Sequence, residues 1–391
     1  MQASDFSKDA PGRLVKTVED QWAFVPAPLP PALDFDGPLV KVLSAADQAL
    51  GRLAGAAHNI PNPHLLIRPF IRREAVLSSR IEGTLTTLAQ LLESEATQKP
   101  NTAQGDLREV MNYVHALEFA LKQTELPMSL RLIRQTHGRL MHGVRGKNQT
   151  PGEFRRHQNY LGPPGCALRD ARFVPPPPPE MQQALHTFEG FLHEPNDLPP
   201  LVRLALIHYQ FESIHPFGDG NGRIGRLLVS LLICAESLLP NPLLYLSAYF
   251  DRERDAYYER LLHVSTAGAW NKWIAFFLNG VREQAEDAVL RSSRLLKLRD
   301  RFHTDCHTAR SSALLHKLVD RLFSQPFVTI SDAAELLDVT PRAAQLNIEK
   351  LMARGMLEEV TGRQRNRLYL AAEVLRAVEE SPVAAGVQVS T

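Results

Sequence analysis

The sequence predicts a mainly α-helical protein, in which a helical bundle with a small β-hairpin is followed by a C-terminal winged helix-turn-helix domain. Apolar residues recur at helical spacing through most of the chain from about residue 39 to residue 310. Beyond residue 312 the pattern changes to short helices, a tight turn and a basic hairpin. A chain of 391 residues with 44% hydrophobic residues has room for two or three domains and a sizeable core.

Composition limits the classes of function. Lys and Arg total 44 against 43 Asp and Glu, so no bulk charge argues for nucleic acid or an anionic membrane, and any basic partner site must be local. The three cysteines are scattered and odd in number, which fits a reducing compartment. The N-terminus lacks the layout of a signal peptide, and no apolar run reaches about 18 residues. We therefore expect a cytoplasmic protein that does not span a membrane.

The first segment, residues 1–100, is predicted to hold an extended strap and then helices. Prolines are frequent in residues 22–31, which excludes a helix interior because proline lacks the backbone N–H. The second of the helices that follow is predicted to end at Glu82, with Gly83 as its C-terminal stop. Ser78 and Glu82 are four residues apart, so the two side chains share one face of that helix.

Residues 101–282 are predicted to form the second domain, a helical bundle. Its helices are interrupted by a non-helical stretch at residues 152–175. Within it, residues 159–161 and 172–174 are predicted to be the two arms of a hairpin. A plain surface hairpin is the alternative to a functional one.

The most informative stretch, residues 214–226, reads IHPFGDGNGRIGR and is followed at once by an apolar run. This pattern predicts a loop that closes onto the N-terminus of a buried helix, where unpaired N–H groups and the helix dipole favour an anion. Arg223 and Arg226 lie on one face of the first turn, an unfavourable place for two cations unless an anion such as a polyphosphate compensates them. His215 can serve as a general base, and Asp219 can hold a metal ion. The alternative is a loop in which the histidine is a cap and the arginines form surface salt bridges.

The remainder of the chain divides into a linker helix at residues 283–311, a winged helix-turn-helix at 312–377 and a disordered tail at 378–391. The first helix of the helix-turn-helix is predicted at Ile330–Leu337. The second helix begins after Thr340, which can cap its N-terminus, and a proline follows at the first helical position.

Basic residues on the winged helix suggest contacts with DNA. Arg363 and Arg365 lie at the predicted tip of the wing, and Arg342 and Gln345 lie on the outward face of the second helix. Against DNA, Glu349 shares that outward face. DNA binding and a protein-interaction or dimerisation role therefore stay open for this domain.

The motif at residues 215–226 matches the signature of the Fic family, HPFx(D/E)GNGRxxR, at every defined position. This resemblance implies a Fic-type helical bundle with a β-hairpin flap. It also implies an enzyme that transfers AMP from ATP to a Ser, Thr or Tyr hydroxyl of a target protein, with Mg²⁺ as cofactor. His215 would be the catalytic base and Asp219 the metal ligand. Relatives that phosphorylate their targets carry Lys at the position of Gly222, so the glycine favours adenylylation. The residues that would bind ATP and its phosphates are Gly218, Asp219, Gly220, Asn221, Gly222, Arg223 and Arg226.

A second resemblance lies upstream. The sequence SSRIEG at residues 78–83 is similar to the inhibitory motif (S/T)xxxE(G/N) that precedes many Fic domains. It implies that Glu82 pairs with Arg226 and prevents productive binding of the γ-phosphate, with Ser78 and Gly83 as the other motif residues. The alternative is a solvated glutamate.

The resemblance further implies an adenine pocket lined by Tyr257 and Tyr258, since a flat aromatic face suits a purine. The family often has an Asn a little downstream, where this chain has Ser265-Thr266-Ala267. The flap would receive an extended target segment by backbone pairing. The residues of this docking site would be Leu161, Gly162, Phe173 and Val174.

Fic proteins of this layout are often dimers, so a homodimer is expected, and self-modification is a further expectation. Two other functions stay open. One is a DNA-binding transcriptional regulator that uses the Fic domain as a nucleotide sensor, which a degraded motif would favour. The other is a hydrolase that removes AMP from targets, with Glu82 orienting the water.

Overall fold

The computed structural model describes residues 1–58, 64–97, 105–123, 127–144, 150–163, 165–306 and 313–380. Residues 378 and 379 of the predicted tail belong to the last helix, Ala372–Glu379, because the buried Val378 continues its apolar face; from residue 381 onward the tail lies outside the described residues. The structure is mainly helical, as predicted. The strands are β1 (Gly12–Lys16), β2 (Trp22–Pro26), β3 (Phe327–Thr329), β4 (Glu358–Glu359) and β5 (Leu368–Leu370). The helices are α1 (Gly37–His58), α2 (His64–Ile81), α3 (Leu88–Ala96), α4 (Asp106–Leu121), α5 (Leu130–Leu140), α6 (Pro178–His193), α7 (Pro200–Ile214), α8 (Asn221–Ala235), α9 (Ser247–Arg252), α10 (Arg254–Ala267), α11 (Trp270–Cys306), α12 (Ala313–Ser324), α13 (Ile330–Leu337), α14 (Pro341–Met352) and α15 (Ala372–Glu379).

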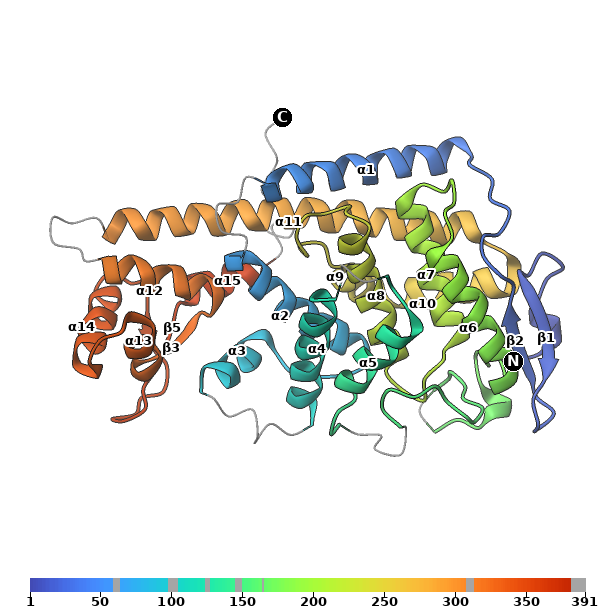
Figure 1. Ribbon diagram of the computed structural model, residues 1–391, viewed down its shortest axis with the longest axis horizontal. Coiled ribbons are helices and arrows are strands. Elements are labelled where there is room, and N and C mark those ends of the chain that lie inside the picture. The colour runs from blue at the N-terminus through green and yellow to red at the C-terminus, as the bar shows by residue number, and fades with distance from the viewer. Residues whose placement is uncertain are drawn as a thin grey trace.

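The long helix α11 runs along much of the longest axis of the molecule, and α1 packs beside it (Figure 1). It continues without a break through the boundary that we expected between residues 282 and 283. Its buried residues Phe277, Val281, Ala285 and Ala288 keep helical spacing on both sides of that point, and no proline interrupts them. The bundle and the linker therefore share one helix.

The N-terminal strap is a β-hairpin. Strands β1 and β2 pair antiparallel, and Phe24 of β2 is fully buried. The backbone N–H of Phe24 donates to the carbonyl oxygen of Val174, at 2.9 Å. The hairpin therefore packs on the segment that was predicted to form the second arm of the flap.

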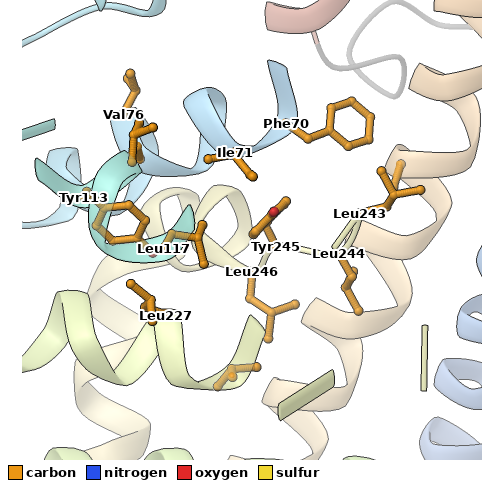
Figure 2. Packing of buried hydrophobic residues seen from close by; sticks show 14 of the residues in the cluster. Phe70, Ile71, Val76, Tyr113, Leu117, Leu227, Leu243, Leu244, Tyr245 and Leu246 are labelled. Carbon is orange, nitrogen blue, oxygen red and sulfur yellow. The ribbon is translucent and has the colours of Figure 1, made fainter. Parts of the chain in front are cut away.

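The core of the bundle lies where α2, α4, α8 and the segment after α8 meet (Figure 2). Figure 2 shows Phe70 and Ile71 of α2 near Tyr245, and Tyr113 of α4 on the other side of the same core. Helix α2 is thereby fixed against α4, α8 and α9. This packing places the end of α2 beside the start of α8.

The C-terminal domain is a winged helix, as predicted. Its sheet has the order β3-β5-β4, and α13 and α14 form the helix-turn-helix. Thr340 caps α14 by accepting a hydrogen bond from the N–H of Ala343, and Pro341 occupies the first turn. The additional helix α12 packs on α2, so the winged helix contacts the helix that ends near Glu82.

Within the part of the chain that the structure describes, no helix is both long enough and apolar enough to cross a membrane.

Candidate active site

His215 occupies the turn that follows α7. Its backbone is left-handed, with φ of +50°, and its N–H still bonds to the carbonyl of Phe211 at 3.0 Å. The ring Nδ1 lies 3.2 Å from the carbonyl oxygen of Glu212. Because a carbonyl only accepts, Nδ1 carries the proton and Nε2 has a free lone pair. Burial lowers the pKa of His215 to about 4, so the ring is a neutral base at physiological pH.

The loop after His215 is closed by side-chain hydrogen bonds. The amide of Asn221 accepts from the N–H of Phe217 at 2.8 Å and donates to the carbonyl of the same residue at 2.9 Å. Gly220 has φ of +76° and precedes the first residue of α8. The loop therefore presents the N-terminus of α8, as predicted. Both groups of the Asn221 side chain are used inside the loop, so contact of this side chain with a phosphate would require these bonds to rearrange.

A histidine that the sequence analysis did not identify lies under the loop. His137 of α5 stacks on the ring of Phe217, with centroids 3.7 Å apart. Its Nε2 donates to the carbonyl of Asp219 at 3.0 Å, and its Nδ1 accepts from the N–H of Gly152 at 2.9 Å. Burial lowers its pKa to about 4 and keeps it neutral. His137 thus fixes the backbone of Asp219 and thereby the position of its carboxylate.

The two motif arginines already have partners. Arg223 donates to Glu109 of α4 at 3.0 Å, and it does not line the cavity described below. Arg226 donates through Nε to the hydroxyl of Ser78 at 2.9 Å and through NH2 to Glu82 Oε1 at 2.6 Å. The pairing of Glu82 with Arg226 is the contact that the inhibitory resemblance implied.

The guanidinium of Arg226 stabilises the ionised form of Glu82. Burial alone would raise the pKa of Glu82, but the guanidinium outweighs it and holds that pKa below its ordinary value. Gly222 leaves room for the pair, because a Cβ there would overlap Glu82 Oε1 and stand 3.0 Å from Arg226 NH1. Gly83 ends the segment with φ of +96°.

A cavity of about 560 Å³ lies in front of these groups. Its volume is within the range of small-molecule sites. The loop at residues 218–222, Glu82 and His215 form one part of its wall. The other part comes from α7, α10 and the predicted flap, and its residues are Asn159, Tyr160, Leu161, Gly162, Pro163, Arg172, Phe173, Tyr209, Glu212, Ser213, Tyr258, Leu261, Leu262 and Ser265.

Only one of the two tyrosines expected in an adenine pocket lines this cavity. Tyr258 does so, whereas Tyr257 is buried in the core and its hydroxyl donates to His208 Nε2 at 2.8 Å. Ser265 also lines the cavity and lies 2.9 Å from the hydroxyl of Tyr209. The side that would hold a purine is therefore built from α10 and α7.

Among its described residues, the predicted flap has one β-bridge, between Leu161 and Phe173, rather than a longer ladder. The N–H of Leu161 donates to the carbonyl of Phe173 at 2.8 Å. Leu161, Gly162 and Phe173 line the cavity, whereas Val174 is buried against the N-terminal hairpin. Pairing of Val174 with Phe24 explains why the second arm is fixed there.

Asp219 is the motif carboxylate that faces solvent. Its side chain is 52% exposed and its Oδ1 lies 3.8 Å from Arg223 NH2. Within the described ranges no cluster of three or more metal-ligating side chains occurs. A single carboxylate nevertheless suits Mg²⁺, which is commonly bound through one or two carboxylates together with substrate phosphates and water.

The residues predicted to contact DNA are at the surface of the winged helix. Arg342, Arg363 and Arg365 are exposed. Gln345 is less exposed, and its amide donates to Glu349 at 2.8 Å. These positions lie on α14 and between β4 and β5, away from the motif at residues 215–226.

Comparison with known families divides the chain in the same way. Residues 40–122 match the model of the Fic/DOC family N-terminal region, and residues 127–233 match the model of the Fic/DOC family. Residues 315–369 match a helix-turn-helix DNA-binding domain.

Similar proteins carry the same family name. A protein adenylyltransferase Fic from Drosophila grimshawi is 33% identical over 161 residues, which are 39% of this chain and 31% of that protein. The one from Drosophila melanogaster is 30% identical over 161 residues, 39% of this chain and 30% of its own length. The chain thus spans about a third of the length of these relatives. A Fic family protein from Desulfovibrio desulfuricans G20 shares the fold, with a TM-score of 0.55 at 20% identity over 88% of this chain and 98% of that one.

Proposed function

The chain is a member of the Fic family with a C-terminal helix-turn-helix domain, and on this premise we propose that it is a protein adenylyltransferase. It transfers AMP from ATP to a Ser, Thr or Tyr hydroxyl of a target protein, which can be the enzyme itself. The observation that carries the proposal is the complete motif, in which neutral His215 and the N-terminus of α8 face one cavity.

The reaction is an in-line displacement at the α-phosphorus. His215 Nε2 takes the proton of the target hydroxyl, the hydroxyl oxygen bonds to the α-phosphorus, and the bond to the bridging oxygen breaks to release pyrophosphate. The lone pair on Nε2 and the low pKa support this role. Such a base contributes about 10²- to 10⁴-fold in rate.

The phosphates are held by the loop from Gly218 to Gly222 and by the N-terminus of α8. Arg223 and Arg226 supply positive charge behind the loop. Mg²⁺, held by Asp219, would neutralise phosphate charge when bound.

Glu82 keeps the site inactive in this proposal. It occupies the guanidinium of Arg226 at 2.6 Å, and Gly222 provides the space in which it does so. The γ-phosphate requires the same guanidinium, so productive binding of ATP requires Glu82 to leave. The target segment docks at Leu161, which lines the same cavity as His215.

The winged helix favours a second activity, the binding of duplex DNA. The match to a DNA-binding helix-turn-helix and the exposed Arg363 and Arg365 support it. The proposal also includes a homodimer, which the layout of the chain supports by resemblance to other Fic proteins. It places the protein in the cytoplasm, which the scattered cysteines support.

The test uses α-labelled ATP. In a Glu82→Gly background, His215→Ala is expected to remove transfer of label to protein, because it removes the base that takes the proton of the target hydroxyl. Equal labelling with and without His215 would contradict the proposal. A thermal melt of each variant controls for folding.

A further inference from the structure

Arg155 is a buried cation beside the turn that holds His215. The proposed reaction does not use this cation. It lies in the segment between α5 and α6, and only 6% of its surface is exposed. Within the described part of the chain, no carboxylate lies within ion-pair distance of Arg155, and the hydrogen bonds of its side chain all go to backbone carbonyls. Burying a guanidinium without a counter-charge is costly, and burial lowers the pKa of Arg155 to about 10.

The carbonyls that Arg155 binds belong to separate segments. Its Nε donates to the carbonyl of His215 at 2.9 Å. Its NH1 donates to His157 at 3.1 Å and its NH2 to Pro176 at 2.5 Å, so it reaches the two ends of the flap. Its own backbone N–H donates to the carbonyl of Pro216 at 2.9 Å. A single planar fork thus connects the catalytic turn to both arms of the flap.

A neighbouring residue reinforces this connection. Asn159 of the flap donates through Nδ2 to the carbonyl of Phe217 at 3.0 Å. His215 itself has a left-handed backbone, which a residue with a Cβ adopts at an energetic cost. Hydrogen bonds from Arg155 and Asn159 to this turn offset that cost.

We propose that Arg155 is a positioning residue that fixes His215 and the target-docking flap in one register. This inference rests on the proposed function, because it takes His215 as the base and the flap as the docking site. Arg155 does not touch the nucleotide in this account. It sets where the target hydroxyl stands relative to His215 Nε2, and a misplacement of about 1 Å can cost about 10²-fold in rate.

The charge of Arg155 affects the pKa of His215, which can be measured and which a purely structural role of Arg155 would not change. Burial is the main cause of the low pKa of His215, and the positive charge of Arg155 lowers it further. The carbonyl of Glu212 and the carboxylates of Glu82 and Asp219 act in the opposite direction. Removal of the guanidinium charge should therefore raise the pKa of His215 from about 4 toward its ordinary value.

The experiment compares Arg155→Gln with Arg156→Gln, a control at the adjacent residue, whose side chain is 82% exposed. Both are made in the 391-residue chain with Glu82→Gly. The measurements are kcat and KM for ATP, binding of ATP, a thermal melt, and the pKa of His215 from NMR titration of its ring, assigned with His215→Ala. Arg155→Lys, which keeps a charge but not the fork, is measured in parallel and is the decisive variant if Arg155→Gln does not fold.

We expect Arg155→Gln to bind ATP normally, to lose about 10²-fold in kcat, and to titrate His215 at a higher pH than the reference. Arg155→Lys should lose kcat while the pKa of His215 stays near that of the reference. Unchanged kcat in both variants would overturn the inference, and so would a loss of kcat in Arg155→Gln with no change in the His215 pKa. If the Glu82→Gly reference transfers no label, the proposed function fails, and the NMR titration still tests the effect of Arg155 on His215.

Discussion

Removing the Glu82 carboxylate should activate the enzyme by a predictable factor. Among the hydrogen bonds that the structure describes, the Glu82 carboxylate accepts only from Arg226 NH2, at 2.6 Å. Glu82 is only 34% exposed and Arg226 is buried, so solvent screens the pair less than it would screen a surface pair. A hydrogen bond to a charged group contributes about 1.5–3 kcal/mol, and the weak screening places this pair in the upper part of that range, at about 2–3 kcal/mol.

That free energy fixes the fraction of molecules in which Arg226 is free for ATP. Since about 1.4 kcal/mol corresponds to a factor of ten, a contribution of about 2–3 kcal/mol leaves on the order of 1–3% of the molecules competent. Glu82→Gly should therefore raise the initial rate of labelling about 30- to 150-fold at subsaturating ATP. Gly is tolerated at this position because α2 ends at Ile81.

The assay follows transfer of α-labelled AMP to protein over time, at ATP concentrations well below KM, for the wild type and Glu82→Gly. Glu93→Ala serves as the matched control, because Glu93 is an exposed glutamate on α3 and should leave the rate unchanged. A rate in Glu82→Gly within twofold of the wild type, with both proteins folded and binding ATP, would refute the reasoning about Arg226.

Three further predictions follow from the geometry. Because the pKa of His215 is about 4, the kcat/KM of Glu82→Gly should stay level from pH 7.5 down to about pH 5, and a pH profile with a midpoint near 6.5 would be inconsistent with the buried base. Burial lowers the pKa of His208 to about 3, below its value in the unfolded chain. As the pH falls, the unfolded chain therefore binds a proton at this histidine before the folded protein does. The free energy of unfolding should decrease as the pH falls below about 6.5. This loss is about 2 kcal/mol at pH 5, and replacing His208 with Gln should flatten the decline in melting temperature between pH 7 and pH 5; an unchanged slope would show that His208 is not responsible. Ser78→Ala removes the hydroxyl that accepts from Arg226 Nε at 2.9 Å, and it should increase labelling by a few-fold to about tenfold, less than Glu82→Gly does, whereas decreased labelling would show that Ser78 serves the active state.

Local patterns explain which parts of the fold could be predicted from the sequence. Thr340 and the proline after it predict the start of α14 from adjacent residues alone. In the structure Thr340 caps this helix, and Pro341 lies in its first turn. The loop at residues 214–226 was predictable for the same reason, because glycines, an asparagine and an apolar run adjoin one another. The boundary expected at residue 282 falls inside α11, because a change in charge along a helix does not end it while its buried face continues.

Contacts between distant segments explain what was missed. His137 lies 82 residues from Asp219, and Arg155 lies 60 residues from His215, yet each bonds directly to the motif loop. The helical period of α5 shows that His137 faces inward but not what it meets there. Tyr257 and Tyr258 are adjacent, so only the packing of α10 against α7 decides that Tyr258 faces the cavity.

The central claim is that the cavity carries AMP transfer by His215 under the control of Glu82. Mass spectrometry of Glu82→Gly protein after incubation with ATP and Mg²⁺ tests it most directly, with the double variant Glu82→Gly/His215→Ala beside it. An AMP adduct on a Ser, Thr or Tyr side chain is expected in the first protein and none in the second. A phosphate adduct in place of AMP, or the same AMP adduct in both proteins, would contradict it.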